Sequence, residues 1–193
     1  MSGTVSSRRL LVTGTTGGIG GAMRDAARIR GWEVVEFNRA DWEAGEAGRP
    51  LEGPFEAVVF ATGTCPVKPL AALTDEAFAE TLAVNCGLFV KLMRRLVREG
   101  LASPSGTKVV AVSSVSAAEG WAGGAAYCAS KGALSAVCRA LDAELKPRGI
   151  SVRAVEPRYV KTRMFDACAG RMGVDPKMAQ DPAELAEEIL SLL

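Results

Sequence analysis

Short apolar runs alternate with amphipathic segments along most of this chain. Five runs bounded by turn residues predict buried strands. They lie at 10–13, 33–37, 57–61, 108–112 and 150–155. Three segments with apolar residues at helical spacing predict helices at 18–30, 75–98 and 127–146. Asp181 followed by Pro182 is typical of a helix start and predicts one more helix.

Strands that alternate with helices predict an α/β fold, a doubly wound parallel sheet with helices on both faces. A chain of 193 residues is long enough to bury a sizeable core, and no linker or repeat divides it. We therefore expect residues 1–193 to form a single domain. Residues 1–7 are polar, and we expect them to be disordered.

Composition excludes several classes of protein. An apolar fraction of 48% is typical of a globular chain, and a net charge of +1 gives no support for nucleic acid or an anionic membrane as partner. No run approaches the roughly 20 apolar residues that span a membrane. The chain contains no histidine, which excludes a Ser-His-Asp hydrolase and a His-ligated metal site, so we expect no metal.

The five cysteines are odd in number and form no C-x-x-C pair. The polar N-terminus has no signal-peptide pattern. These features predict reduced thiols and a cytoplasmic location.

A glycine-rich loop at 13–20 separates the first predicted strand from the first helix. In such a loop Gly14 permits the tight turn, Gly18 lets the backbone approach a pyrophosphate, and Gly20 lets the helix lie close to the sheet. The N-terminus of the helix favours phosphate through its free N–H groups. The alternative is a glycine turn with no ligand.

Tyr127 and Lys131 stand four residues apart on a predicted helix, so they share one face about one turn apart. An ammonium near a phenol favours the phenolate and makes proton exchange easier at neutral pH. Ser114 comes just after the predicted strand at 108–112 and precedes Tyr127 by thirteen positions. Taken singly, each residue has a structural alternative, such as a packed tyrosine or a strand cap.

The loop, Ser114, Tyr127 and Lys131, in this order and at these separations, resemble the short-chain dehydrogenase/reductase family, and Asn85 matches the fourth member of its catalytic tetrad. The resemblance extends over most of the chain. It implies that Tyr127 is the general acid or base and that Ser114 binds the substrate oxygen. It further implies that Lys131 lowers the Tyr127 pKa and holds the nicotinamide ribose, while Asn85 helps to hold a water that links Lys131 to solvent.

Two departures from the family pattern are visible. Only residues 38–56 separate the second strand from the third, where the family has a helix, a strand and another helix. The sequence also ends just after the helix that precedes the family's last strand. We therefore expect a Rossmann fold that is shortened at one edge and lacks the usual last strand.

The resemblance also implies a nicotinamide dinucleotide cofactor. Asn38 stands where an acidic residue would bind the ribose of NAD, and Arg39 is placed to meet the 2′-phosphate of NADP, so we expect NADP(H) to be favoured over NAD(H). The alternative is that Arg39 is a solvated surface charge. Asp41 matches a position that contacts the adenine. The implied cofactor-binding residues are Gly14, Thr16, Gly18, Ile19, Gly20, Asn38, Arg39, Asp41, Ala61, Gly63, Tyr127, Lys131, Pro157, Val160 and Thr162.

Arg158 replaces the glycine that usually follows Pro157 in the family. Arginine does not adopt glycine's backbone conformations cheaply, so the loop is either shifted or sends Arg158 into the cleft. With Lys161 and Arg163 nearby, the second case would suit an anionic substrate. The alternative is three solvated charges.

Together these features predict an NADP(H)-dependent oxidoreductase that interconverts a ketone or aldehyde and an alcohol. The segment 164–177, with Gly170 and Gly173 as flexible points, is expected to be a mobile substrate lid. Two alternatives stay open: a catalytically idle dinucleotide-binding regulatory protein, and a non-redox variant such as an epimerase or dehydratase.

The family resemblance implies a homodimer. In family members the helices that contain Asn85 and Tyr127 pair across a two-fold axis, and here they carry small or apolar residues. The missing last strand removes the family's other common interface, which favours a dimer over a tetramer.

Overall fold

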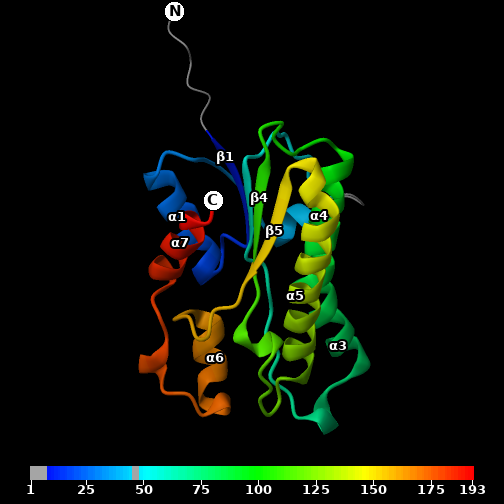
Figure 1. Ribbon diagram of the computed structural model, residues 1–193. Helices are drawn as coiled ribbons and strands as arrows, with labels where there is room; N and C mark the ends of the chain where they lie inside the picture. Colours follow the sequence, from blue (N-terminus) through cyan, green and yellow to red (C-terminus); the bar gives the residue numbers. More distant parts are fainter. Residues whose placement is uncertain (1–7, 45–47) are drawn as a thin grey trace, which may run out of the picture.

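The computed structural model describes residues 8–44 and 48–193, so the prediction about residues 1–7 lies outside it. The described residues form a five-stranded, all-parallel sheet between two helical layers (Figure 1). The predicted doubly wound fold is confirmed. The strands are β1 Arg9–Thr13, β2 Glu33–Phe37, β3 Ala57–Phe60, β4 Thr107–Val112 and β5 Ile150–Val155.

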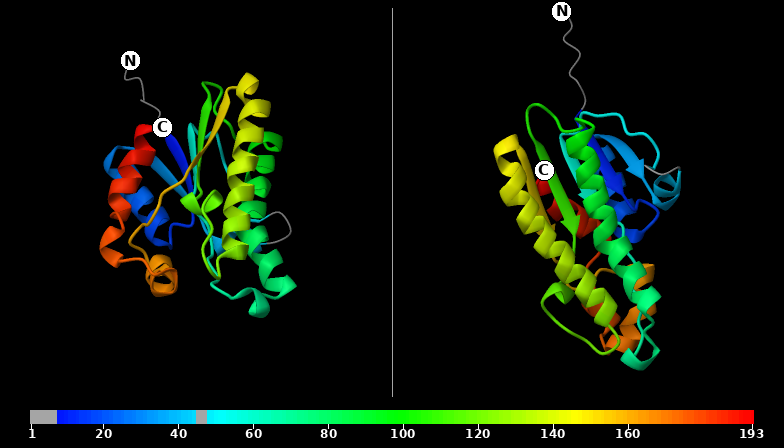
Figure 2. Two further views of the ribbon diagram at one scale, coloured as in Figure 1. Left: turned by 60° about the horizontal axis from the view of Figure 1, so that its bottom comes forward. Right: turned by 90° about the vertical axis from the view of Figure 1, so that its right-hand side faces the viewer.

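Two helices cover one face of the sheet and three lie on the other (Figure 2). α1 and α7 form the first layer, and α3, α4 and α5 form the second. The helices are α1 Gly18–Ile29, α2 Arg39–Glu43, α3 Asp75–Leu82, α4 Leu88–Arg98, α5 Ala125–Leu145, α6 Arg163–Met172 and α7 Pro182–Ser191. The short α2 and α6 were not predicted from the sequence.

Successive residues of β1 point to opposite faces and enter different cores, as the two-residue period of a strand requires. Leu10 and Val12 pack with Met23 of α1 and Ile189 of α7. Leu11 belongs to the other core, which α4 and α5 cover. Burying each such side chain stabilises the fold by about 1.5–3 kcal/mol.

The order of strands across the sheet is β2-β1-β3-β4-β5. The chain moves outward in one direction from β1 to β2 and in the other from β3 to β5. The loops that follow β1 and β3 therefore diverge at the carboxyl edge of the sheet and leave a crevice, the usual ligand site of such folds.

Both departures from the family pattern are present in the described residues. Between β2 and β3 the chain forms only α2, and no strand follows β5 in residues 156–193. β2 and β5 are consequently the edge strands. The collapsed edge is packed by Trp42 of α2, whose ring meets the edge of the Phe37 ring at 4.7 Å between centroids.

The helix predicted at 75–98 is present with these bounds, but it contains a turn of a different helical type. A π-helical turn, Ala83–Gly87, joins α3 to α4. It contains the buried Asn85. Such turns are rare and occur frequently at functional sites, and the apolar pattern of the sequence gives no sign of this one.

Candidate active site

Three predicted side chains meet in one cavity of about 120 Å³. Ser114 lies just beyond the end of β4, and α5 begins at Ala125 and carries Tyr127 and Lys131 one turn apart. All three line the cavity. The sequence thus predicted the residues that the carboxyl end of β4 and the start of α5 bring together.

Lys131 is buried, and its Nζ donates a hydrogen bond of 2.8 Å to the carbonyl oxygen of Val112. The same Nζ lies 5.7 Å from the centroid of the Tyr127 ring. Burial disfavours the ammonium form and lowers the pKa of Lys131 to about 8. Lys131 therefore holds its proton less firmly than an exposed lysine.

Burial raises the pKa of the Tyr127 hydroxyl above its usual range, and a hydrogen bond with Ser114 opposes that rise. The sequence predicts that Lys131 lowers the pKa of Tyr127. In the structure the pKa of Tyr127 is raised, because the loss of solvation on burial is the larger effect. At neutral pH Tyr127 is protonated. A protonated hydroxyl is what a general acid needs to donate to a carbonyl oxygen.

Asn85 lies behind the cavity and does not line it. Its Nδ2 donates to the carbonyl of Thr64 at 2.9 Å and to Ser130 Oγ at 2.8 Å, and its Oδ1 accepts from the Thr64 amide at 2.7 Å. Gly63 separates it from Lys131: a Cβ there would lie 3.4 Å from Asn85 Oδ1 and 3.8 Å from Lys131 Nζ. In this geometry Asn85 fixes the loop after β3.

A second, larger cavity of about 620 Å³ adjoins the first along the crevice. Six residues line both cavities, so the two are continuous: Ile19, Ala61, Thr62, Gly63, Thr162 and Met164. The predicted cofactor-binding residues in the larger groove are Gly14, Thr16, Gly18, Ile19, Arg39, Ala61, Gly63 and Thr162. Pro157, Val160, Tyr127 and Lys131 line the smaller cavity.

The groove fits the diphosphate of a dinucleotide. Gly14 has φ of +71°, and a Cβ there would lie 2.8 Å from the carbonyl oxygen of Ala61. At Gly18 a Cβ would lie 2.6 Å from Thr162 Cγ2. α1 starts at the groove with no side-chain cap and no acidic residue in its first turn, which leaves amides free for phosphate.

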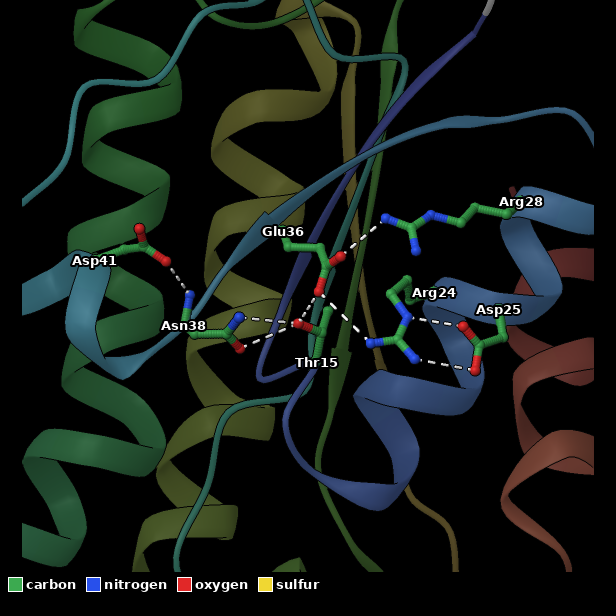
Figure 3. Close-up of polar contacts among 7 residues, drawn as sticks. All are labelled: Thr15, Arg24, Asp25, Arg28, Glu36, Asn38 and Asp41. Atoms are coloured by element: carbon green, nitrogen blue, oxygen red, sulfur yellow. Dashed lines mark hydrogen bonds and ion pairs between the residues drawn. The ribbon is translucent and has the colours of Figure 1, made fainter.

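Two predicted cofactor residues are engaged within the protein, as Figure 3 shows. Asn38 Nδ2 donates to Thr15 Oγ1 at 2.9 Å, and the Asn38 amide donates to Asp41 Oδ2 at 2.7 Å in the capping box of α2. Arg49 Nε also donates to Asp41. Neither Asn38 nor Asp41 lines the groove, and Gly20 lies outside it as well.

Glu36 of β2 was missed by the sequence reasoning. Its carboxylate accepts from Thr15 Oγ1 at 2.5 Å and pairs with Arg28 at 2.9 Å and Arg24 at 3.7 Å (Figure 3). The hydrogen bond from Thr15 and the two guanidinium groups hold the pKa of Glu36 below its usual range. The acidic charge next to the glycine loop is thus paired mainly with Arg28, and with Arg24, which also binds both carboxylate oxygens of Asp25.

Three basic side chains line the groove: Arg39, Lys91 and Arg163. Arg39 is largely exposed and forms an ion pair of 3.1 Å with Glu43 one turn along α2. An exposed pair with a single contact is weak, unlike a bidentate one, so Arg39 is readily released to another anion. Trp42 of α2 and Lys91 of α4 also line the groove, and the sequence analysis named neither of them.

Arg158 lines the smaller cavity but is not a free cation. Its guanidinium binds both carboxylate oxygens of Glu119, at 2.8 and 3.1 Å. The pair joins the loop after β5 to the loop after β4. Residues 163–172 form α6, capped by Thr162, where we expected a mobile segment; its motion as a lid stays a prediction.

The fold is that of a dinucleotide-binding α/β protein, and a serine, a tyrosine and a lysine line the smaller of its two joined cavities. Residues 44–171 match the family model described as short chain dehydrogenase. The chain belongs to the short-chain dehydrogenase/reductase family. No helix in the described part of the chain is long and apolar enough to cross a membrane.

Several named reductases are similar to the chain. L-xylulose reductase of Bos taurus is 29% identical over 185 residues, which cover 84% of this chain and 76% of the relative. D-erythrulose reductase of Gallus gallus is 30% identical over 179 residues, covering 81% and 73%. Carbonyl reductase (NADPH) 2 of Sus scrofa is 27% identical over 197 residues, covering 91% and 79%.

Solved structures share the fold. An actinorhodin polyketide ketoreductase variant with NADPH has a TM-score of 0.79 at 22% identity, covering 96% of this chain and 90% of that one. A structure described as an NAD(P)-dependent gluconate 5-dehydrogenase from Beutenbergia cavernae, with bound NADP, has a TM-score of 0.80 at 22% identity, covering 97% and 90%.

Proposed function

We propose that this protein is an NADP(H)-dependent reductase that converts a small ketone or aldehyde to an alcohol. The observation that carries the proposal is the meeting of Ser114, Tyr127 and Lys131 in a cavity continuous with the dinucleotide groove. The similar proteins named L-xylulose reductase, D-erythrulose reductase and carbonyl reductase support a carbonyl substrate.

Each side chain has a role that its position supports. Ser114 donates a hydrogen bond to the carbonyl oxygen, and Tyr127 passes its proton to that oxygen as negative charge develops there. Lys131 places a positive charge beneath the Tyr127 ring. The loop at Gly14 and Gly18 holds the nicotinamide cofactor, which supplies the hydride when bound.

Burial, which raises the pKa of Tyr127, keeps the proton-donating form used in reduction available at neutral pH. Reduction needs the protonated hydroxyl, which is the dominant form at neutral pH. Oxidation needs the phenolate, which burial disfavours. Asn85 acts as a positioning residue, because it ties the loop of Gly63 and Thr64 to the helix of Tyr127 through Ser130.

Replacing Tyr127 by phenylalanine tests the proposed chemistry. The change removes the proton donor and keeps the ring that packs near Trp121. Turnover of a carbonyl substrate with NADPH should fall by about 10²–10⁴-fold. Cofactor binding, measured by NADPH fluorescence, should stay close to that of the parent. If Tyr127→Phe kept most of its activity, the assignment of the proton donor would be wrong.

The same measurements separate the alternatives. NADPH binding without turnover of any carbonyl or alcohol would favour a regulatory dinucleotide-binding protein. Conversion of a substrate with no net change in NADPH absorbance would favour an epimerase or dehydratase.

The preference for NADP(H) over NAD(H) is proposed from Arg39, which lines the groove with Lys91 and Arg163. The balance of Glu36 by Arg24 and Arg28 removes one source of repulsion for a 2′-phosphate.

Arg39→Ala tests this preference. The variant should weaken NADPH binding by about 1.5–3 kcal/mol, because one charge-assisted contact is lost, and should leave NADH binding nearly unchanged. Arg94→Ala, at an exposed position of α4 that lines neither cavity, is the matched control. Equal affinity of the parent for both cofactors would refute the preference.

We further propose that residues 8–193 act as one dinucleotide-binding domain and that two copies form a homodimer in the cytoplasm. The outer side of α5 supports the dimer. It exposes the small residues Ala129, Ala136 and Ala140, which allow another helix to approach closely.

A further inference from the structure

The wall of the smaller cavity that faces Ser114 and Tyr127 is almost entirely apolar. It is built from the loop after β3, the loop before α5, and α6. Its side chains are Cys65, Trp121, Met164, Phe165, Cys168 and Met172. The rings pack on neighbours: the Trp121 and Tyr127 centroids lie 6.3 Å apart, and those of Tyr159 and Phe165 lie 5.7 Å apart.

The polar side chains on this wall already have protein partners. Ser116 Oγ accepts a hydrogen bond of 3.2 Å from Trp121 Nε1. Arg158 is held by both oxygens of Glu119, at 2.8 and 3.1 Å. The wall therefore offers little to a substrate hydroxyl or carboxylate.

The two thiols behave as part of the apolar surface. Cys65 Sγ and Cys168 Sγ lie 3.5 Å apart and link the loop after β3 to α6. Burial raises the pKa of the Cys65 thiol, so it stays neutral. Ser114 and Tyr127 remain the side chains placed to meet the oxygen of a substrate.

The size of the cavity limits the substrate as well. Its volume is about 120 Å³. An apolar cavity of about 150 Å³ in another protein takes up benzene. Part of this space adjoins the larger groove and the residues assigned to the cofactor, so only a small alkyl or aryl substituent fits beside the reacting carbonyl.

We propose that the preferred substrate is a compact, uncharged ketone or aldehyde with an alkyl or aryl substituent, rather than a polyhydroxy carbonyl or a keto acid. This inference rests on the proposed reductase function and specifies its substrate class. It separates this chain from the similar proteins named for xylulose and erythrulose. A polyol would lose its hydrogen bonds to water on entering the cavity. An apolar wall offers few hydrogen bonds in their place, so binding of a polyol would be unfavourable.

A matched pair of ketones tests the hydroxyl part of the proposal. Pentan-2-one and 4-hydroxybutan-2-one differ only by a methyl in place of a hydroxyl at the far end. With NADPH, kcat/KM for pentan-2-one should exceed that for 4-hydroxybutan-2-one by about 10–100-fold, the range a hydrophobic pocket gives for one group. Erythrulose should react more slowly still.

Two outcomes would overturn it, for different reasons. Equal or faster reduction of 4-hydroxybutan-2-one or erythrulose would refute the apolar preference and leave the reductase function standing. Failure of all three compounds and of an aryl ketone to consume NADPH would refute the proposed function, and the substrate class with it.

The charge part of the proposal is tested by releasing Arg158. Levulinate and 5-methylhexan-2-one have the same shape, with a carboxylate in place of an isopropyl group. The parent should prefer 5-methylhexan-2-one. Glu119→Gln frees Arg158 and should shift that preference toward levulinate by about 10-fold or more, since one charged contact is gained. Adding Arg158→Met should reverse the shift.

Glu144→Gln, an exposed change on α5 that lines neither cavity, should leave the ratio unchanged. A parent enzyme that already prefers levulinate would contradict the proposal, because Arg158 would then bind anions despite Glu119. A Glu119→Gln variant with an unchanged ratio would also contradict it.

Discussion

Lys131 is a charged side chain in a buried place, with a backbone carbonyl as its hydrogen-bond acceptor. Its pKa is lowered from an ordinary 10.5 to about 8. Because the pKa differs between the folded and the unfolded chain, this residue makes the folding stability depend on pH. Between those two values the unfolded chain binds more protons than the folded one. Stability contributed by this residue is therefore smallest below pH 8 and rises with pH up to about 10.5.

Lys131→Met should remove this dependence. The free energy of unfolding of the parent, relative to the variant, should increase by about 3 kcal/mol between pH 7 and pH 10. Urea unfolding at several pH values measures it. Lys108→Met, at an exposed position of β4, should give a curve parallel to the parent. Parallel curves for the parent and Lys131→Met would contradict the prediction.

At this same scale, the sequence predicted three side chains that share a cavity, but not the contacts around them. Ser114, Tyr127 and Lys131 were found from local spacing, and they do share a cavity. The pairing of Glu119 with Arg158 joins residues 39 positions apart in two loops. No local sequence pattern predicts such a contact, because it depends on the conformations of both loops.

At the scale of elements, the apolar runs predicted the strands, whereas the sequence analysis did not predict the helices α2 and α6. α2 has only five residues, and the packing of Trp42 on Phe37 stabilises it more than helix propensity does. Its capping box, Asn38 with Asp41, was a usable signal. α6 has apolar residues at helical spacing, but Gly170 and Gly173 favoured the interpretation of a flexible segment.

α7 is the element that covers the sheet beside α1. Ile189 is fully buried there against the core of Leu10, Val12 and Met23. Ile189→Ala should lower the free energy of unfolding by about 2–5 kcal/mol, as large-to-small changes in packed cores do. Glu184→Ala, on the exposed side of α7, should cost about 0.5 kcal/mol or less. A loss at Ile189 as small as that at Glu184 would mean that α7 is not part of the folded core.

At the scale of the whole molecule, the described sheet ends in two open edges, β2 and β5, and the small exposed residues gather on α5. Edge pairing would extend the sheet, whereas helix pairing closes a two-fold dimer without it. The proposed dimer uses the helices.

Ala136→Glu tests the proposed dimer, because a charge at the centre of a close helix contact is costly to bury. Light scattering at micromolar concentration should give a dimer for the parent and a monomer for the variant. Ala183→Glu, exposed on α7 in the other layer, should stay dimeric. A monomeric parent would exclude the dimer.

The Cys65 and Cys168 sulfurs lie 3.5 Å apart, so a reagent that reacts with both thiols could report the position of α6. One sulfur belongs to the loop after β3 and the other to α6, so the predicted motion of α6 as a lid would change the distance between them. A fluorogenic dialkylating reagent emits only after it bridges two neighbouring thiols. Because burial raises the pKa of the Cys65 thiol, alkaline pH favours the reaction, and the emission would report that Cys65 and Cys168 lie close together in solution.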